Sequence, residues 1–119
     1  MATEAGIQKA VLEYLAMRRD VTCWRNNVGA FGGQSRQGKR WWVRFGRVGQ
    51  ADISGLVRPF GVRLEIEVKA PAGGCTENQM AFGDEIKEYG GIWLVVRSVQ
   101  ETEDKLGEAI KEWRAKWGP

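Results

Sequence analysis

The chain has 119 residues, of which 43% are hydrophobic and 28% charged, as is typical of one globular domain. Its net charge of +3 is unevenly distributed: residues 21–51 hold six bases and no acid, whereas the rest holds 12 bases and 15 acids, which suggests an anionic polymer as partner. The absence of histidine excludes Ser-His-Asp and Cys-His catalysis and zinc fingers, so any enzyme chemistry must use carboxylates, lysine, tyrosine or a hard metal ion.

The first predicted element is a helix that begins after the N-cap residue Thr3 and extends to about Arg19. Its apolar residues recur at the spacing of a core-facing side: Ile7, Val11, Tyr14 and Leu15. Glu4 lies one turn earlier on this side, although a first-turn carboxylate can also serve only the helix dipole. The N-terminus lacks a signal-peptide pattern and no apolar run reaches the roughly 20 residues of a membrane helix. We therefore expect a cytoplasmic protein without a membrane partner.

A short strand is predicted near residues 21–28, before a long, basic and glycine-rich segment at 29–50. Within this segment, residues 40–45 are expected to form one strand of a small hairpin. The cationic side chains of the segment are Arg36, Lys39, Arg40, Arg44 and Arg47, and its aromatic centre is Trp41, Trp42 and Phe45. Segments this long inside a compact domain are usually functional or disordered. The aromatic side chains either stack on a partner or pack onto the sheet, and the pattern leaves both open.

Residues 51–70 are predicted to form a β-hairpin with a proline turn at 58–61. In its second strand, apolar and charged residues alternate, so Glu67 and Lys69 share one face. Asp52, on the first strand, is expected to come alongside Glu67 through strand twist or a bulge. Two carboxylates and a lysine around one point suit a hard ion such as Mg²⁺. Each residue also has an ordinary alternative, since Asp52 can cap a turn and the charged face can be solvated.

A second helix is predicted from Thr76 to about Tyr89, with Phe82, Ile86 and Tyr89 as its apolar side. Gln79 completes a capping box with Thr76 and also falls near this inward side. Residues 92–97 are apolar on both faces, which predicts a central, covered strand.

Ser98 and Glu101 predict a capping box for a last helix. Its apolar side comprises Leu106, Ala109, Ile110, Trp113 and Trp117. The element order is therefore α-β-β-β-α-β-α, an α/β fold with a mixed sheet between helices, in a single domain spanning residues 1–119. The two cysteines, Cys23 and Cys75, are expected to be free thiols.

The ordered set of Glu4, Gly49-x-x-Asp52, Glu67-Val68-Lys69 and Thr76-x-x-Gln79 resembles the PD-(D/E)xK nucleases, and more narrowly the virus-type replication-repair nuclease (VRR-NUC) branch. The stretches WRNNVGAFGG, GQADISGLV and YGGIWLVVRS extend the resemblance over nearly the whole chain. An E-x-K tripeptide alone is common, so the specificity lies in the order and the separations. The proline that names the superfamily is replaced by Ala51, a position without a catalytic atom. The resemblance implies a restriction-endonuclease-like α-β-β-β-α-β core, to which this chain adds a C-terminal helix.

The resemblance also implies roles for individual residues. Asp52, Glu67 and the carbonyl of Val68 would bind Mg²⁺ or Mn²⁺, and Glu4 would complete the site directly or through water, with Glu65 as the reserve candidate. Lys69 would position and help activate the attacking water, and Gln79 would fix Lys69 or the scissile phosphate. The cations of the basic segment would grip DNA phosphates, while Trp41 and Trp42 would stack on bases.

The function implied is that of a metal-dependent, structure-selective DNA endonuclease that leaves a 5′-phosphate and a 3′-hydroxyl. Small stand-alone members of the family resemble archaeal Holliday-junction resolving enzymes and act as homodimers, so we expect a homodimer that resolves four-way junctions. Two alternatives stay open. One is a nuclease for flaps, nicks or duplex ends in repair or restriction, and the other is a catalytically silent DNA-binding module on the same fold.

Overall fold

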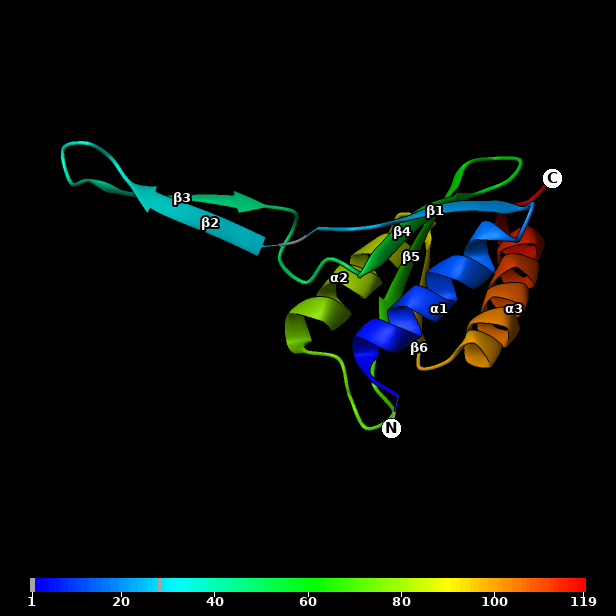
Figure 1. The fold of residues 1–119 in the computed structure, drawn as a ribbon. Helices are drawn as coiled ribbons and strands as arrows, with labels where there is room; N and C mark the ends of the chain where they lie inside the picture. Colours follow the sequence, from blue (N-terminus) through cyan, green and yellow to red (C-terminus); the bar gives the residue numbers. More distant parts are fainter. Residues whose placement is uncertain (1, 28) are drawn as a thin grey trace.

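The computed structural model describes residues 2–27 and 29–119, with the backbone alone for 29–31 and 43–45. The described residues form three helices and six strands (Figure 1). In chain order these are α1 (Glu4–Ala16), β1 (Val21–Arg25), β2 (Gly29–Gln34), β3 (Arg40–Phe45), β4 (Ile53–Val57), β5 (Val62–Val68), α2 (Glu77–Glu88), β6 (Ile92–Val96) and α3 (Val99–Trp117). Val28, the last residue of the first predicted strand, lies outside the described residues.

The main sheet has the strand order β1-β4-β5-β6. β1, β4 and β5 are antiparallel neighbours, whereas β6 runs parallel to β5 after the crossover through α2. β2 and β3 form a separate antiparallel ribbon that projects away from the body and contributes to a long axis of 58 Å (Figure 1). The expected α/β architecture is confirmed at this level, because the order without the ribbon is α-β-β-β-α-β-α.

The hydrophobic core lies on one face of the main sheet. Leu64, Ile66 and Val68 of β5 have no exposed surface and pack in one cluster with apolar residues of α1 and α3. The helical contributions are Ile7, Val11 and Leu15 from α1, and Leu106 and Ile110 from α3. Each such side chain contributes about 1.5–3 kcal/mol on burial, and together they fix which face of β5 is apolar. The alternating charged residues of β5 therefore face the other side, where α2 lies.

The position of β6 differs from the prediction. β6 pairs with β5 alone and occupies an edge of the described sheet, so the expectation of a central strand was wrong. Its residues are apolar on both faces because α3 packs against one face and α2 against the other. On the α2 side, the backbone of Gly83 lies directly against the ring of Trp93, where a Cβ would clash. Helices on both faces, rather than strands on both sides, explain the apolar run.

Two helix ends also differ from expectation. Tyr89 is the C-cap of α2 and is 84% exposed, because the inward side of this helix stops at Ile86. At the start of α3, Ser98 Oγ accepts the N–H of Glu101, but the Glu101 carboxylate pairs with Lys105 at 2.8 Å and does not close a capping box onto Ser98. None of the described helices is long and apolar enough to cross a membrane.

Candidate active site

The neighbouring ends of β4 and β5 bring Asp52 and Glu67 together. Ile53 pairs with Ile66 in the antiparallel register, so the next position places Asp52 opposite Glu67 on the same face. In addition, Asp52 Oδ2 accepts the backbone N–H of Val68 at 2.8 Å. The register of the hairpin alone therefore holds the two carboxyl groups side by side, without the bulge that we considered.

The buried carboxyl group of Glu67 is not fully compensated by its neighbours. It is 2% exposed, and its Oε2 atom accepts no hydrogen bond from the described residues. Burial, followed by the hydrogen bond and the negative charge of Asp52, raises the pKa of Glu67 to about 8, while Lys69 acts in the opposite direction. Burying a carboxylate with one oxygen unpaired is costly unless a cation or a proton compensates it. The donor set at Glu67 therefore fits a hard cation.

Lys69 lies beside this carboxylate pair. Its ammonium group donates to Gln79 Oε1 at 2.8 Å and lies 3.7 Å from Glu67 Oε1. Its backbone N–H donates to Val96 O at 3.0 Å, so the parallel pairing with β6 continues through this residue. Because the Lys69 side chain is only 10% exposed, its amino group is confined to the site.

Gln79 connects the start of α2 to both charged groups. Its Oε1 accepts the N–H of Thr76 at 2.9 Å, and its own N–H donates to Thr76 Oγ1 at 3.2 Å, which completes the predicted capping box. The same Oε1 accepts from Lys69, while Nε2 donates to Glu67 Oε1 at 3.2 Å. Both ends of the amide are used, so its orientation is fixed. The Gln79 side chain therefore caps α2 and holds Lys69 and Glu67 at the same time.

Gly49 holds the segment before Asp52 against α2. Its φ is +78°, a backbone conformation that L side chains rarely adopt. A Cβ at this position would also collide with the carbonyl of Asn78 and lie 3.0 Å from the backbone nitrogen of Gln79. Only glycine allows this approach, which explains why the spacing Gly49-x-x-Asp52 belongs to the site.

The two further glutamates have different surroundings. Glu4 is exposed at the start of α1, and its charge is the smallest contribution that raises the pKa of Glu67. Glu65 is fully buried, with Oε2 accepting from Ser54 Oγ and Oε1 accepting from Arg63. Both oxygens of Glu65 are thus engaged in a structural network. Glu4 remains the better candidate to complete a cation site.

The described residues contain no group of three Asp, Glu, Cys or His side chains arranged to hold a metal ion. A cation beside Glu67 would therefore rely on Asp52 and Glu67 directly. Water could connect it to Glu4, in keeping with the indirect role that the resemblance allows. The carbonyl of Val68 stays a predicted ligand.

An open hollow of about 430 Å³ adjoins Asp52 and is lined by Gln8, Arg25, Asn26, Asn27, Gln50, Ala51 and Asp52. Asn26 organises it: Nδ2 donates to Ala51 O at 2.9 Å and to Ser54 Oγ at 2.6 Å, and the backbone N–H donates to Asp52 O at 2.8 Å. Asn26 lies in the stretch WRNNVGAFGG, from which no role for it is predicted. An asparagine just after a strand was the available signal.

The basic arm, defined here as residues 29–45, carries part of the predicted DNA-binding set on the projecting ribbon (Figure 1). Its exposed arm cations are Arg36, Lys39 and Arg40, whereas the side chain of Arg44 lies outside the described part of the chain. Trp41 and Trp42 are 43% and 75% exposed. They sit across from Gly33 and Gly32, where a Cβ would lie within 3 Å of each ring. The rings therefore cover the glycines of the ribbon instead of packing onto the main sheet.

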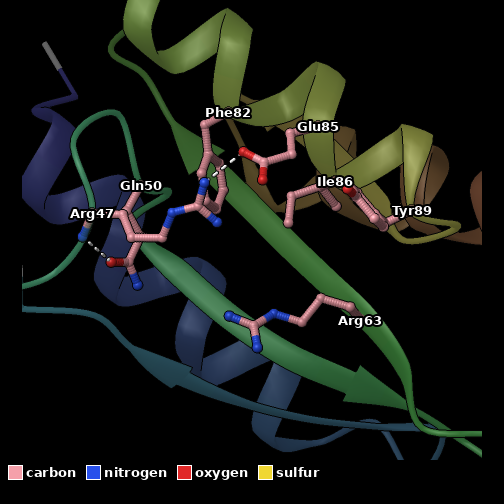
Figure 2. A pocket seen from close by; sticks show the side chains of 7 residues that line it. All are labelled: Arg47, Gln50, Arg63, Phe82, Glu85, Ile86 and Tyr89. Carbon is pink, nitrogen blue, oxygen red and sulfur yellow. Dashed lines mark hydrogen bonds and ion pairs between the residues drawn. The ribbon is translucent and has the colours of Figure 1, made fainter.

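Arg47 does not join the arm cations. Its guanidinium pairs with Glu85 at 2.5 Å and lies 5.1 Å from the centre of the Phe82 ring, on the side of α2 (Figure 2). There it borders a second open hollow of about 490 Å³, the arginine pocket, which is lined by Arg47, Gln50, Arg63, Phe82, Glu85, Ile86 and Tyr89. Neither a role for Arg63 nor this pocket is predicted from the sequence.

No protein-family model matches the chain, and no curated protein matches it. The relationship to the VRR-NUC branch therefore rests on the motif residues and stays a prediction, as do the nuclease-type core and the cytoplasmic location. The geometry does bring Asp52, Glu67, Lys69 and Gln79 to one place, with Glu4 close enough for its charge to act on Glu67.

Proposed function

We propose that this protein is a metal-dependent, structure-selective endonuclease that hydrolyses phosphodiester bonds in DNA. One observation carries the proposal: the buried Glu67 beside Asp52 has an oxygen that accepts no hydrogen bond from the described residues, and Gln79 bridges Lys69 to Glu67. A structural ion pair would not need a second carboxylate at this position. Oxygen donors without histidine or cysteine favour Mg²⁺ or Mn²⁺ over softer metals.

Each residue has a defined task in such a reaction. A divalent ion held by Asp52 and Glu67 would lower the pKa of a water molecule and offset charge on the phosphate. Lys69 would donate a hydrogen bond to the attacking water or to a phosphate oxygen, where negative charge develops. Gln79 would hold the Lys69 ammonium group in place during the reaction at the phosphate.

The basic arm supports a DNA substrate of irregular shape. Its cations offer phosphate contacts that do not depend on sequence, and Trp42 offers an exposed ring for stacking. An arm that projects from the body reaches into a branch or an opened end more readily than along a closed duplex. A four-way junction is therefore the first substrate proposed, with a homodimer supplying two sites related by a twofold axis.

Two other candidates are kept. One is a nuclease for flaps, nicks or duplex ends, which also offer phosphates to the cations of the arm, and flaps add unpaired bases. The other is a catalytically silent DNA-binding module on the same fold, which would use the basic arm alone.

The deciding experiment is cleavage of four-way junctions, flaps, nicked duplex and linear duplex by the purified protein in Mg²⁺ or Mn²⁺. We expect cleavage of the junction by the wild type, and loss of cleavage with retained junction binding for Lys69→Ala and Asp52→Asn. Lys111→Ala, an exposed lysine on α3, is the matched control and should cut normally. Cleavage confined to linear ends would contradict the junction assignment. Binding without cleavage in either metal would establish the silent module.

A further inference from the structure

The arginine pocket lies on the same side of β5 as the candidate active site. α2 borders the pocket on one side and Arg63 of β5 lies on the other (Figure 2). Arg63 and Glu67 share that face of β5 and are four residues apart, which is about 13 Å along a strand. Gln50 lines both the pocket and the hollow at Asp52. A DNA strand that runs along this face of β5 from the active site would therefore meet the pocket.

Arg63 is held in a fixed orientation at the floor of the pocket. Its Nε and Nη2 atoms donate to Glu65 Oε1 at 3.0 and 2.7 Å, and Ser54 Oγ donates to the other oxygen of Glu65 at 2.5 Å. Glu65 is fully buried, yet the Arg63 side chain is 51% exposed. The buried network thus presents a flat, oriented guanidinium to the pocket. Guanidinium planes stack on nucleobases and contact phosphates.

The opposite wall supplies an apolar surface. Ile86 and Tyr89, from the C-terminal end of α2, line the hollow on the side opposite Arg63 (Figure 2). Tyr89 is 84% exposed, so its side chain contributes little to the stability of the fold. Exposed aromatic side chains are the usual stacking partners of unpaired bases.

Arg47 stands at another side of the pocket. Its ion pair with Glu85 is half-exposed on both partners, and such pairs contribute little to stability. A DNA phosphate can therefore replace Glu85 at small cost. We propose that the arginine pocket binds the unpaired nucleotide next to the cleaved bond, with its base between Tyr89 and Arg63 and a phosphate at Arg47. This inference rests on the proposed function and specifies which DNA the same site selects.

The test measures binding without cleavage. Fluorescence anisotropy in EDTA compares a labelled duplex that contains a three-nucleotide gap with the fully paired duplex of the same length. We expect Tyr89→Ala to weaken binding of the gapped DNA at least about fivefold and to leave the paired duplex within twofold. Arg63→Lys keeps the charge for Glu65 but removes the planar stack, and should act in the same direction. The matched controls Trp117→Ala and Arg19→Lys should change neither affinity.

The outcomes separate this inference from the nuclease proposal. Equal loss on gapped and paired DNA, or no loss for Tyr89→Ala, would overturn the pocket assignment even if the protein cuts DNA in Mg²⁺. Selective loss on gapped DNA supports the pocket even if the wild-type protein cuts nothing, which would instead overturn the nuclease proposal.

Discussion

Replacing Glu67 by glutamine tests the electrostatic core of the candidate site without any substrate. Burial and Asp52 raise the pKa of Glu67 from its ordinary value of 4.5 to about 8. Between these values the folded protein keeps a proton that the unfolded chain releases, so the free energy of unfolding falls as the pH rises. At 1.36 kcal/mol per pH unit, the metal-free wild type should lose about 3 kcal/mol of stability between pH 5 and pH 7.5.

Glu67→Gln should remove this dependence, because the amide has the same shape and never ionises. The window is unusually clean, since the chain has no histidine, the side chain that normally titrates there. Asp20 and Glu101 have lowered pKa values, so these carboxyl groups titrate below the pH range of the experiment. The raised pKa of Cys23, about 11, lies above it.

The assay is urea unfolding in EDTA at pH 5.0 and 7.5, followed by tryptophan fluorescence. Glu103→Gln, an exposed carboxylate on α3, is the matched control and should keep the wild-type pH dependence. Adding Mg²⁺ at pH 7.5 should restore stability to the wild type by preferential binding to the folded state, and less so to Glu67→Gln. Equal pH dependence in the wild type and in Glu67→Gln would refute the reasoning.

Three further predictions concern the parts that surround Glu67. Gly49→Ala should lower stability by about 1–3 kcal/mol in urea unfolding and reduce cleavage, whereas an unchanged variant would show that the approach to α2 is dispensable. Changing the three arm cations to glutamine should reduce the slope of log affinity against log salt by about two to three, measured by anisotropy, and an unchanged slope would remove the arm from the DNA contact. Thr76→Ala and Gln79→Ala should each cost about 1 kcal/mol of stability, but only Gln79→Ala should abolish cleavage, so equal cleavage by the two variants would reduce Gln79 to a cap.

The hairpin part of the site was predictable because it depends on local rules. Once the turn at 58–61 was placed, strand alternation fixed the face of Glu67, and the antiparallel register then brought Asp52 opposite. The capping box likewise predicted where α2 begins, and the spacing of Gln79 to Phe82 and Ile86 predicted that it turns inward. These features need only a few neighbouring residues and therefore appear in the sequence.

Other features depend on how separate elements pack, which periodicity does not report. Tyr89 continues the apolar spacing of α2, but the helix side that faces the sheet ends at Ile86, so its ring is exposed. The apolar run of β6 reports helices on both faces and says nothing of its place at the edge. The sequence predicts Arg47 as a phosphate contact, which stays a prediction, but its position beside Glu85 depends on the docking of α2.

The double use of Gln79 has a consequence for heat sensitivity. The first turn of a helix opens locally before the rest of a domain unfolds, because it has the fewest supporting hydrogen bonds. In this chain that opening would also release Lys69 and Glu67, since one amide serves all three contacts. Warming should therefore inactivate the protein reversibly several degrees below the melting of its core, and amide hydrogen exchange at the start of α2 should follow the loss of activity.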